Sequence, residues 1–143
     1  VEKFIPRVIT SILNNSPITV YGDGKNIRDW IHVTDHVNAI DSIINNGMVG
    51  ESYNIGASNE WANIDLVNLI CSMMDTKLGH VHGTSKGLIT FINDRPGHDF
   101  RYAIDSGKIN NKLGWTPSIS FIPGISQTID WYLELFNKNF NNK

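Results

Sequence analysis

The feature that most constrains the fold is the alternation of helical and extended patterns along the chain. Four segments repeat apolar residues every three or four positions, which places those residues on one face of a helix: 1–15, 34–46, 64–75 and 120–136. Four short runs between them are rich in the branched and aromatic side chains typical of strands: 18–21, 27–33, 52–55 and 88–92. The alternation predicts an α/β or α+β fold with a small mixed sheet and helices.

Helix boundaries are also marked in the sequence. Thr34, Asn63 and Ser106 are typical N-cap residues, and Ser120 starts the last helical pattern. Gly47 follows the second pattern, where glycine commonly ends a helix. A polar segment over residues 76–86 and a second one over 94–99 are expected to be loops.

No repeat and no linker divides the chain. We therefore expect one unit over residues 1–136, followed by a frayed asparagine-rich tail over residues 137–143. A chain of 143 residues is long enough to bury its own core. Its first residue is Val1 rather than methionine, and we interpret the sequence as part of a longer chain.

Composition excludes several classes of function. With 12 basic and 14 acidic side chains, the net charge of −2 provides no basic surface for nucleic acid or for an anionic membrane. No apolar run reaches the roughly 18 residues that a membrane span needs. Cys71 is the single cysteine, which suits a reducing compartment. We therefore expect a cytoplasmic protein with neither a nucleic-acid nor a membrane partner.

Cationic and amide groups lie on loops beside expected strand or helix ends. Arg28 follows a glycine-rich turn, Arg95 and His98 flank a Pro-Gly turn, and Asn63 precedes a helix. Guanidinium groups bind phosphate through two hydrogen bonds, and a helix start offers free N–H groups to an anion. This combination is what a diphosphate site requires.

Ordinary ion pairs are the alternative interpretation of the same arginines. Arg28 is close in sequence to Asp23 and Asp29, and Arg95 lies between Asp94 and Asp99. Spacing alone does not decide between phosphate binding and surface ion pairs.

Two motif-like patterns lack the context that their chemistry needs. Tyr21 and Lys25 have the Tyr-x-x-x-Lys spacing of short-chain dehydrogenases, but that pair must share a helix face, and glycines here predict a turn. The same turn contains only part of the dinucleotide-binding pattern G-x-G-x-x-G, since residue 27 is isoleucine. No nucleophile–base pair stands out, and we expect no catalytic residue in this chain.

The histidines could in principle bind a metal. His80 and His82 are separated by one residue and could combine with His32 or His36. No Cys, Asp or Glu stands at ligand spacing, so we expect loop histidines and no metal site.

Six motifs, in their order along the chain, resemble one known family. They are Glu2–Pro6, Tyr21–Gly24 with Ile27–Trp30, His32–His36, Tyr53–Gly56, Asp94–Asp99 with Arg101–Asp105, and Leu113–Pro117. Together they resemble the C-terminal part of the dTDP-glucose 4,6-dehydratases, a family of extended short-chain dehydrogenases. The resemblance extends from Glu2 to about Tyr132. Its Arg-Pro-Gly-His-Asp loop is narrower than the other motifs and points to the dTDP-glucose branch.

The resemblance implies a division of labour between two halves of an enzyme. In the family, an N-terminal Rossmann half binds NAD and supplies the catalytic groups that convert dTDP-glucose to dTDP-4-keto-6-deoxyglucose, a lyase reaction of nucleotide-sugar metabolism and deoxysugar biosynthesis. This chain contains none of those motifs. It is therefore expected to be the substrate-binding part, inactive and unable to bind NAD alone, of an enzyme that forms a homodimer.

The resemblance also assigns roles to residues. Arg28, Asn63 and Arg95 would hold the diphosphate, while Glu2, Lys3, Tyr21 and His98 would line the nucleoside. Thr19, which stands where the family has proline, and Val20 would add backbone contacts. The expected set is completed by the rest of the loop: Asp94, Pro96 and Gly97. Because the residues and the family agree on Arg28, Asn63 and Arg95, we favour phosphate binding over ion pairs.

Two other functions remain open at this point. The chain could belong to a related epimerase or dehydratase that acts on a UDP-sugar, or it could be a non-catalytic nucleotide-binding module. In the family, segments 29–33, 34–46 and 52–55 would pack against the Rossmann half. We therefore expect apolar faces to be exposed in this chain.

Overall fold

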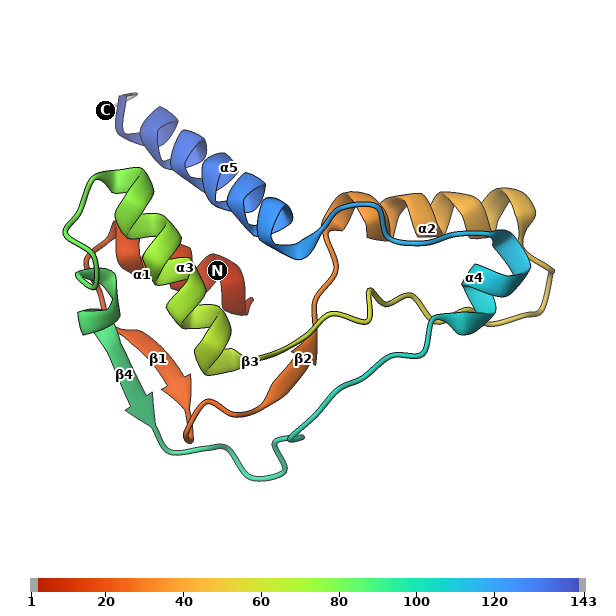
Figure 1. Cartoon of the computed structure of the whole chain (residues 1–143), viewed down its shortest axis with the longest axis horizontal. Coiled ribbons are helices and arrows are strands. Elements are labelled where there is room, and N and C mark those ends of the chain that lie inside the picture. The colour runs from red at the N-terminus through yellow and green to blue at the C-terminus, as the bar shows by residue number, and fades with distance from the viewer. Residues whose placement is uncertain (1–2, 142–143) are drawn as a thin grey trace. The chain divides into compact units, whose positions relative to one another are not determined.

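The computed structural model describes residues 3–141, which form two compact units (Figure 1). Unit 1 comprises residues 3–26, 62–98 and 125–141, and unit 2 comprises residues 27–61 and 99–124. Each unit is assembled from segments that are remote in sequence. A single polar linker, the usual sign of a domain boundary, could therefore not have revealed this division.

Unit 1 contains a parallel pair of strands and three packed helices. Strands β1 (Ile18–Tyr21) and β4 (Ile89–Ile92) pair in parallel, with Ile18 opposite Ile89 (Figure 1). The helices are α1 (Phe4–Leu13), α3 (Asn63–Leu78) and most of α5 (Phe121–Asn141), and a 3₁₀ helix, η1, spans Ser85–Leu88. Its core consists of apolar side chains that are at most 5% exposed: Val8, Ile9, Ile12, Ile18, Val20, Leu66, Val67, Ile70, Cys71, Met74, Ile125 and Ile129.

A buried carboxylate holds the loop that follows α3. Asp75 is 1% exposed, and its carboxylate accepts hydrogen bonds from the backbone N–H groups of Gly83, at 2.8 Å, and Ser85, at 3.0 Å. The helix ends at Gly79, whose φ of +69° is the left-handed conformation that glycine adopts readily. The segment expected as a loop over 76–86 is therefore partly helical at both ends.

Unit 2 has a smaller buried core than unit 1. It contains β2 (Ile27–Asp29), α2 (Val33–Asn46), β3 (Glu60–Ala62, whose last residue belongs to unit 1) and α4 (Gly107–Leu113). Strands β2 and β3 form a second two-stranded sheet. The buried core is limited to Ala39, Ile109 and Trp115, with partly buried apolar side chains around them.

Asp35 has the same function in unit 2 that Asp75 has in unit 1. It is 1% exposed and accepts hydrogen bonds from the backbone N–H and hydroxyl of Ser118, at 3.0 and 2.8 Å, and from the N–H of Ile119, at 3.0 Å. These bonds fasten α2 to the segment that follows α4.

The structure confirms the α/β class and corrects several local predictions. The run over 52–55 is not a strand, and the strand expected over 27–33 ends at Asp29. A strand needs a hydrogen-bonded neighbour, and within residues 3–141 the structure pairs segment 52–55 with none. Of the predicted asparagine-rich tail over residues 137–143, residues 137–141 continue α5, and residues 142–143 lie outside the described residues.

Two of the three predicted N-caps are also wrong. His32, not Thr34, caps α2, since its Nδ1 accepts a hydrogen bond from the Thr34 N–H at 3.3 Å. Ala62 occupies the N-cap of α3, and Asn63 is already helical. Ser106 does occupy the N-cap of α4, although its side chain makes no capping bond.

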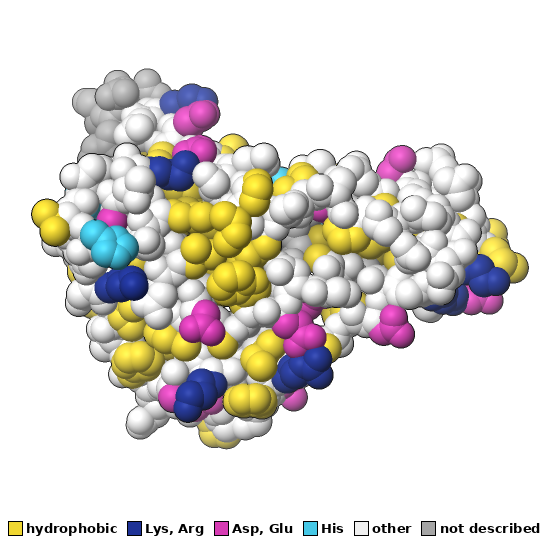
Figure 2. All heavy atoms as spheres, in the orientation of Figure 1, with side chains coloured by type: hydrophobic (Ala, Val, Ile, Leu, Met, Phe, Trp, Pro, Cys, Tyr) yellow, Lys and Arg dark blue, Asp and Glu magenta, His cyan; other side chains and the backbone are white. Residues whose placement is uncertain are grey.

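Helix α2 exposes apolar side chains along one face. Val33, Val37, Ile40 and Ile44 follow each other at steps of four, three and four residues and are 68, 56, 41 and 76% exposed. Figure 2 shows hydrophobic side chains at the surface of the drawn face of the molecule. None of the helices described in residues 3–141 is both long and apolar enough to cross a membrane.

Candidate functional site

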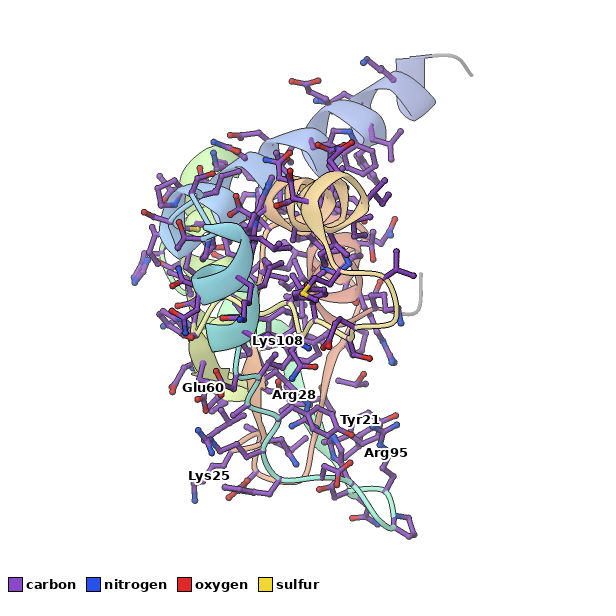
Figure 3. All side chains as sticks on the ribbon, turned by 90° about the vertical axis from the view of Figure 1, so that its right-hand side faces the viewer. Tyr21, Lys25, Arg28, Glu60, Arg95 and Lys108 are labelled. Atoms are coloured by element: carbon purple, nitrogen blue, oxygen red, sulfur yellow. The ribbon has the colours of Figure 1, made fainter. Side chains whose placement is uncertain are left out.

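The ends of β1 and β4 bring two predicted site segments together in unit 1. Because the strands are parallel, the turn after Tyr21 and the loop after Ile92 leave the sheet at the same edge. The Gly22 N–H donates to the Ile92 carbonyl at 2.8 Å and so continues the pairing beyond Tyr21. Figure 3 labels Tyr21 and Arg95, which mark these two segments.

His98 contacts predicted site residues from both segments at this edge. Its side chain is 7% exposed, and its Nδ1 lies 2.6 Å from Asp94 Oδ1. The Tyr21 ring meets it edge-on, with 6.0 Å between the ring centroids and 77° between the planes. The hydrogen bond with His98 holds the pKa of Asp94 below its ordinary value, as does the Arg95 N–H at 2.8 Å. Tyr21, Asp94 and His98, all predicted site residues, are thus in contact.

Arg95, Pro96 and Gly97 form the exposed tip of the same loop. Gly97 has a φ of +70°, and the His98 N–H donates to the Arg95 carbonyl at 3.3 Å, which closes the turn. Within residues 3–141, the Arg95 guanidinium has no hydrogen-bond or ion-pair partner. Asp94 binds the backbone of Arg95 instead of its guanidinium, so the ion pair between them is not formed.

The remaining predicted residues of unit 1 lie on β1 and at the start of α1. Val20 is 1% exposed as a whole residue, so the structure leaves neither its side chain nor its backbone open for the predicted contact. The Thr19 hydroxyl is buried and has no hydrogen-bond partner in the described part of the chain. Lys3 is exposed at the N-cap of α1, where its carbonyl accepts the Arg7 N–H at 3.0 Å. Glu2 lies outside the described residues.

The predicted anion site at the start of α3 is wrong in one respect. The Asn63 N–H donates to the Asn26 carbonyl at 3.0 Å, and the Ile64 N–H donates to the Gly24 carbonyl at 2.9 Å. Two of the first N–H groups of the helix are therefore already engaged, and Asp65 adds an acidic side chain to its first turn. A contact from Asn63 to an anion would have to come from its side chain.

Arg28 belongs to unit 2, where backbone carbonyls hold it. Its guanidinium donates to the carbonyls of Ile27, at 2.6 Å, Asp99, at 2.8 Å, and Phe100, at 3.3 Å, and lies 4.3 Å from the centroid of the Tyr102 ring. Asp23, which was one candidate ion-pair partner, forms its salt bridge with Lys25 at 2.9 Å.

Asp29, the other candidate partner of Arg28, binds backbone N–H groups. It accepts from Ala57, Ser58 and Asn59 at 3.0, 3.3 and 2.7 Å. A Cβ at Gly56 would lie 2.7 Å from Asp29 Oδ2, which explains why glycine precedes this loop. This role was not predicted: the Arg-Asp-Trp and Tyr-Asn-Ile-Gly motifs are both visible in the sequence, but only the fold brings Asp29 to the loop after Gly56.

A cavity of unit 2 also escaped the sequence analysis. It has a volume of about 470 Å³ and draws its lining from three of the motifs noted above: His36, Tyr53, Asn54, Ile55, Ala103, Ile104 and Asp105. None of these residues was predicted to bind a ligand.

No metal site is formed by the side chains of residues 3–141, where no group of three or more His, Cys, Asp or Glu residues could hold an ion. His80 has Asp75 Oδ1 at 4.0 Å from its Nδ1, and His32 caps α2.

Comparison with known proteins assigns the chain to a family. Residues 1–128 match the sequence profile described as GDP-mannose 4,6 dehydratase. The chain belongs to this family. It is 47% identical over 133 residues to a dTDP-glucose 4,6-dehydratase of Xanthomonas campestris, with 92% of this chain and 38% of the relative aligned.

Solved structures within the family agree. A dTDP-glucose 4,6-dehydratase of Bacillus anthracis in complex with NAD has a TM-score of 0.79 at 42% identity, covering 93% of this chain and 40% of that one. A Streptomyces venezuelae enzyme of the same name, with NAD bound, has a TM-score of 0.81 at 37% identity, covering 93% and 39%. The resemblance inferred from the motifs is confirmed, and the chain spans about two fifths of the length of these relatives.

Proposed function

We propose that this chain is the substrate-binding, C-terminal part of a dTDP-glucose 4,6-dehydratase. The observation that carries the proposal is the edge formed by β1 and β4, where an exposed Arg95 stands beside the Tyr21, Asp94 and His98 cluster. The high identity to relatives of that name supports the same assignment.

The roles proposed for the residues follow from their chemistry. The Arg95 guanidinium presents the planar fork that binds two phosphate oxygens at once. Arg28, in unit 2, and the Asn63 side chain, in unit 1, are each proposed as diphosphate ligands, and Tyr21, His98, Lys3 and Glu2 as nucleoside contacts. Binding energy from this remote part of the substrate positions the sugar for chemistry elsewhere.

The residues present do not fit NAD. Residues 3–141 contain no glycine-rich turn between a strand and a helix, because the turn at Gly22–Gly24 leads into β2. We therefore derive no reaction step from this chain and assign NAD, which would accept a hydride from the sugar and return it, to the part of the enzyme that precedes it.

That preceding part is also the proposed partner of α2. The apolar face formed by Val33, Val37, Ile40 and Ile44 is what a covering layer of the whole enzyme would bury. We propose that the complete enzyme is a cytoplasmic homodimer, with its NAD-binding half covering this face.

The decisive experiment is a titration of the chain with dTDP. Arg95→Ala is expected to weaken dTDP binding about 10-fold or more, because a charge-assisted contact is worth about 1.5–3 kcal/mol. Arg7→Ala is the matched control, since Arg7 is also an exposed arginine of unit 1 and is expected to leave affinity unchanged. Absence of dTDP binding, or equal affinity of wild type and Arg95→Ala, contradicts the assignment.

Two further outcomes separate the alternatives. Tighter binding of UDP than of dTDP would favour an enzyme of UDP-sugars. Turnover of dTDP-glucose by the purified chain with added NAD would contradict the proposed division between two halves.

A further inference from the structure

Asp94 is an unexpected residue in a site proposed to bind a diphosphate. A carboxylate beside phosphate groups repels them unless its charge is engaged elsewhere. Here Oδ1 of Asp94 lies 2.6 Å from His98 Nδ1 and accepts the Arg95 N–H at 2.8 Å. Its Oδ2 lies beside the Gly22 turn, where a Cβ added to that glycine would be 3.4 Å away, and the side chain as a whole is 39% exposed. Oδ1, the oxygen with hydrogen-bond partners, therefore faces the protein's own groups.

We infer that Asp94 is a positioning residue, which fixes the His98 ring with its proton on Nδ1 instead of contacting the nucleotide itself. An ionised carboxylate can only accept hydrogen bonds, so the ring nitrogen that faces it must carry a proton. In the neutral imidazole the other nitrogen, Nε2, is then an acceptor. The hydrogen bond of one nitrogen sets the tautomer that the other presents.

The tautomer has a consequence for recognition, which rests on the proposed function. An acceptor at Nε2 suits a nucleoside hydroxyl or imide N–H, and it does not suit a phosphate oxygen, which has no proton to donate. The Tyr21 ring, edge-on to His98, supports the ring from the neighbouring turn. This tautomer is compatible with the proposed assignment of His98 to the nucleoside, while Arg95, three residues earlier on the same loop, would take the phosphate.

Long-range ¹H–¹⁵N correlation spectra of the histidine rings in the ligand-free chain test the inference directly. At a pH where His98 is neutral, its proton is expected on Nδ1 in the wild type. Asp94→Ala is expected to move the proton wholly or partly to Nε2. A wild-type proton on Nε2, or the same tautomer in wild type and Asp94→Ala, overturns the inference.

Asp94→Asn provides a second measurement if the alanine variant does not fold. The asparagine keeps an acceptor oxygen but loses the charge, and a hydrogen bond to a charged group is the stronger one. The Nδ1-bound proton of His98 is therefore expected to move upfield in Asp94→Asn. An unchanged resonance overturns the inference.

Titration with dTDP separates this inference from the proposed function. Asp94→Ala is expected to weaken dTDP binding about 3- to 10-fold, the value of one ordinary hydrogen bond. Asp23→Ala, which removes an exposed carboxylate paired with Lys25 on the neighbouring turn, is the matched control and is expected to leave affinity unchanged. Weaker binding with an unchanged tautomer overturns the positioning role. An Nδ1 proton in a chain that does not bind dTDP contradicts only the proposed function.

Discussion

Helices α3 and α2 have similar lengths, 16 and 14 residues, but they differ in how far their apolar side chains are buried. The apolar side of α3 is completely buried in unit 1, where Leu66, Val67, Ile70 and Met74 are all 0% exposed. In α2 the fully buried apolar residue is Ala39, with Ile43 partly buried beside it, whereas Val33, Val37, Ile40 and Ile44 are exposed. A helix that is apolar on more than one side is expected between two layers. The apolar side of α3 is therefore buried within unit 1, whereas α2 has a second, exposed apolar face that another layer of protein could cover.

The same substitution in the two helices gives the largest expected difference. Ile70→Ala removes a fully buried side chain and leaves a cavity, which should reduce the free energy of unfolding by about 2–5 kcal/mol. Ile44→Ala removes an exposed side chain and should change it by less than about 0.5 kcal/mol. Urea unfolding followed by circular dichroism compares the two variants. Losses of equal size would contradict the contrast between the helices.

The two buried carboxylates offer a second comparison, because they carry out the same task in different units. Burial raises the pKa of Asp75, but hydrogen bonds from Ser85 and Gly83 outweigh it and hold the pKa below the ordinary value. Burial likewise raises the pKa of Asp35, and the bonds from Ile119 and Ser118 bring it below that value. A lowered pKa means that the folded state favours the charged form.

Acid should therefore destabilise both units. Each carboxylate stabilises the fold fully above its unfolded pKa of about 4, and this contribution is lost as the pH falls through the lower folded pKa. Asp75→Asn and Asp35→Asn place an amide where N–H groups donate, and each should lower the free energy of unfolding by about 1–3 kcal/mol at pH 7. Because the titrating carboxylate is gone, stability should also fall less steeply with pH below about pH 4, the acid limb of the stability curve. Unfolding measured at pH 3, 5 and 7 checks this. Asp65→Asn, an exposed carboxylate of α3, is the control. An acid limb as steep in both buried variants as in the wild type would contradict the prediction.

Local patterns predicted the elements whose cause is local. Helix α1 appears where the apolar spacing placed it, because its own side chains decide which face is buried. Strands β1 and β4 also lie where they were predicted, and each has the other as its hydrogen-bonded neighbour. Segment 52–55 has the side chains of a strand but no neighbour to pair with, and pairing is not a local property. Asn63 likewise has the side chain of an N-cap, while carbonyls of Asn26 and Gly24, remote in sequence, engage the N–H groups of the helix start.

The same distinction applies to the candidate site. Residue chemistry identified Arg95 and His98 as members of a loop that could bind a diphosphate, and the resemblance to the family added the nucleoside. The contact between His98 and Tyr21 depends on the parallel pairing of β1 with β4, which no local pattern indicates. The His98 and Asp94 pair, four residues apart, was within reach of sequence spacing, but only the turn at Gly97 shows that the two side chains meet.

The smallest expected effect on stability concerns the outer face of α2. Ile40→Gln with Ile44→Gln should change the free energy of unfolding by no more than about 1 kcal/mol in total, since both side chains are exposed. The variant should nevertheless bind less of a dye that fluoresces on apolar surfaces, because the two residues belong to one continuous face. Val81→Gln is the control: Val81 is 82% exposed but lies alone in a loop of unit 1, so its loss should leave the fluorescence unchanged. If the α2 variant and the Val81 variant bound the dye equally, the outer face of α2 would be no more than scattered exposed residues, and its difference from α3 would say nothing about a covering layer.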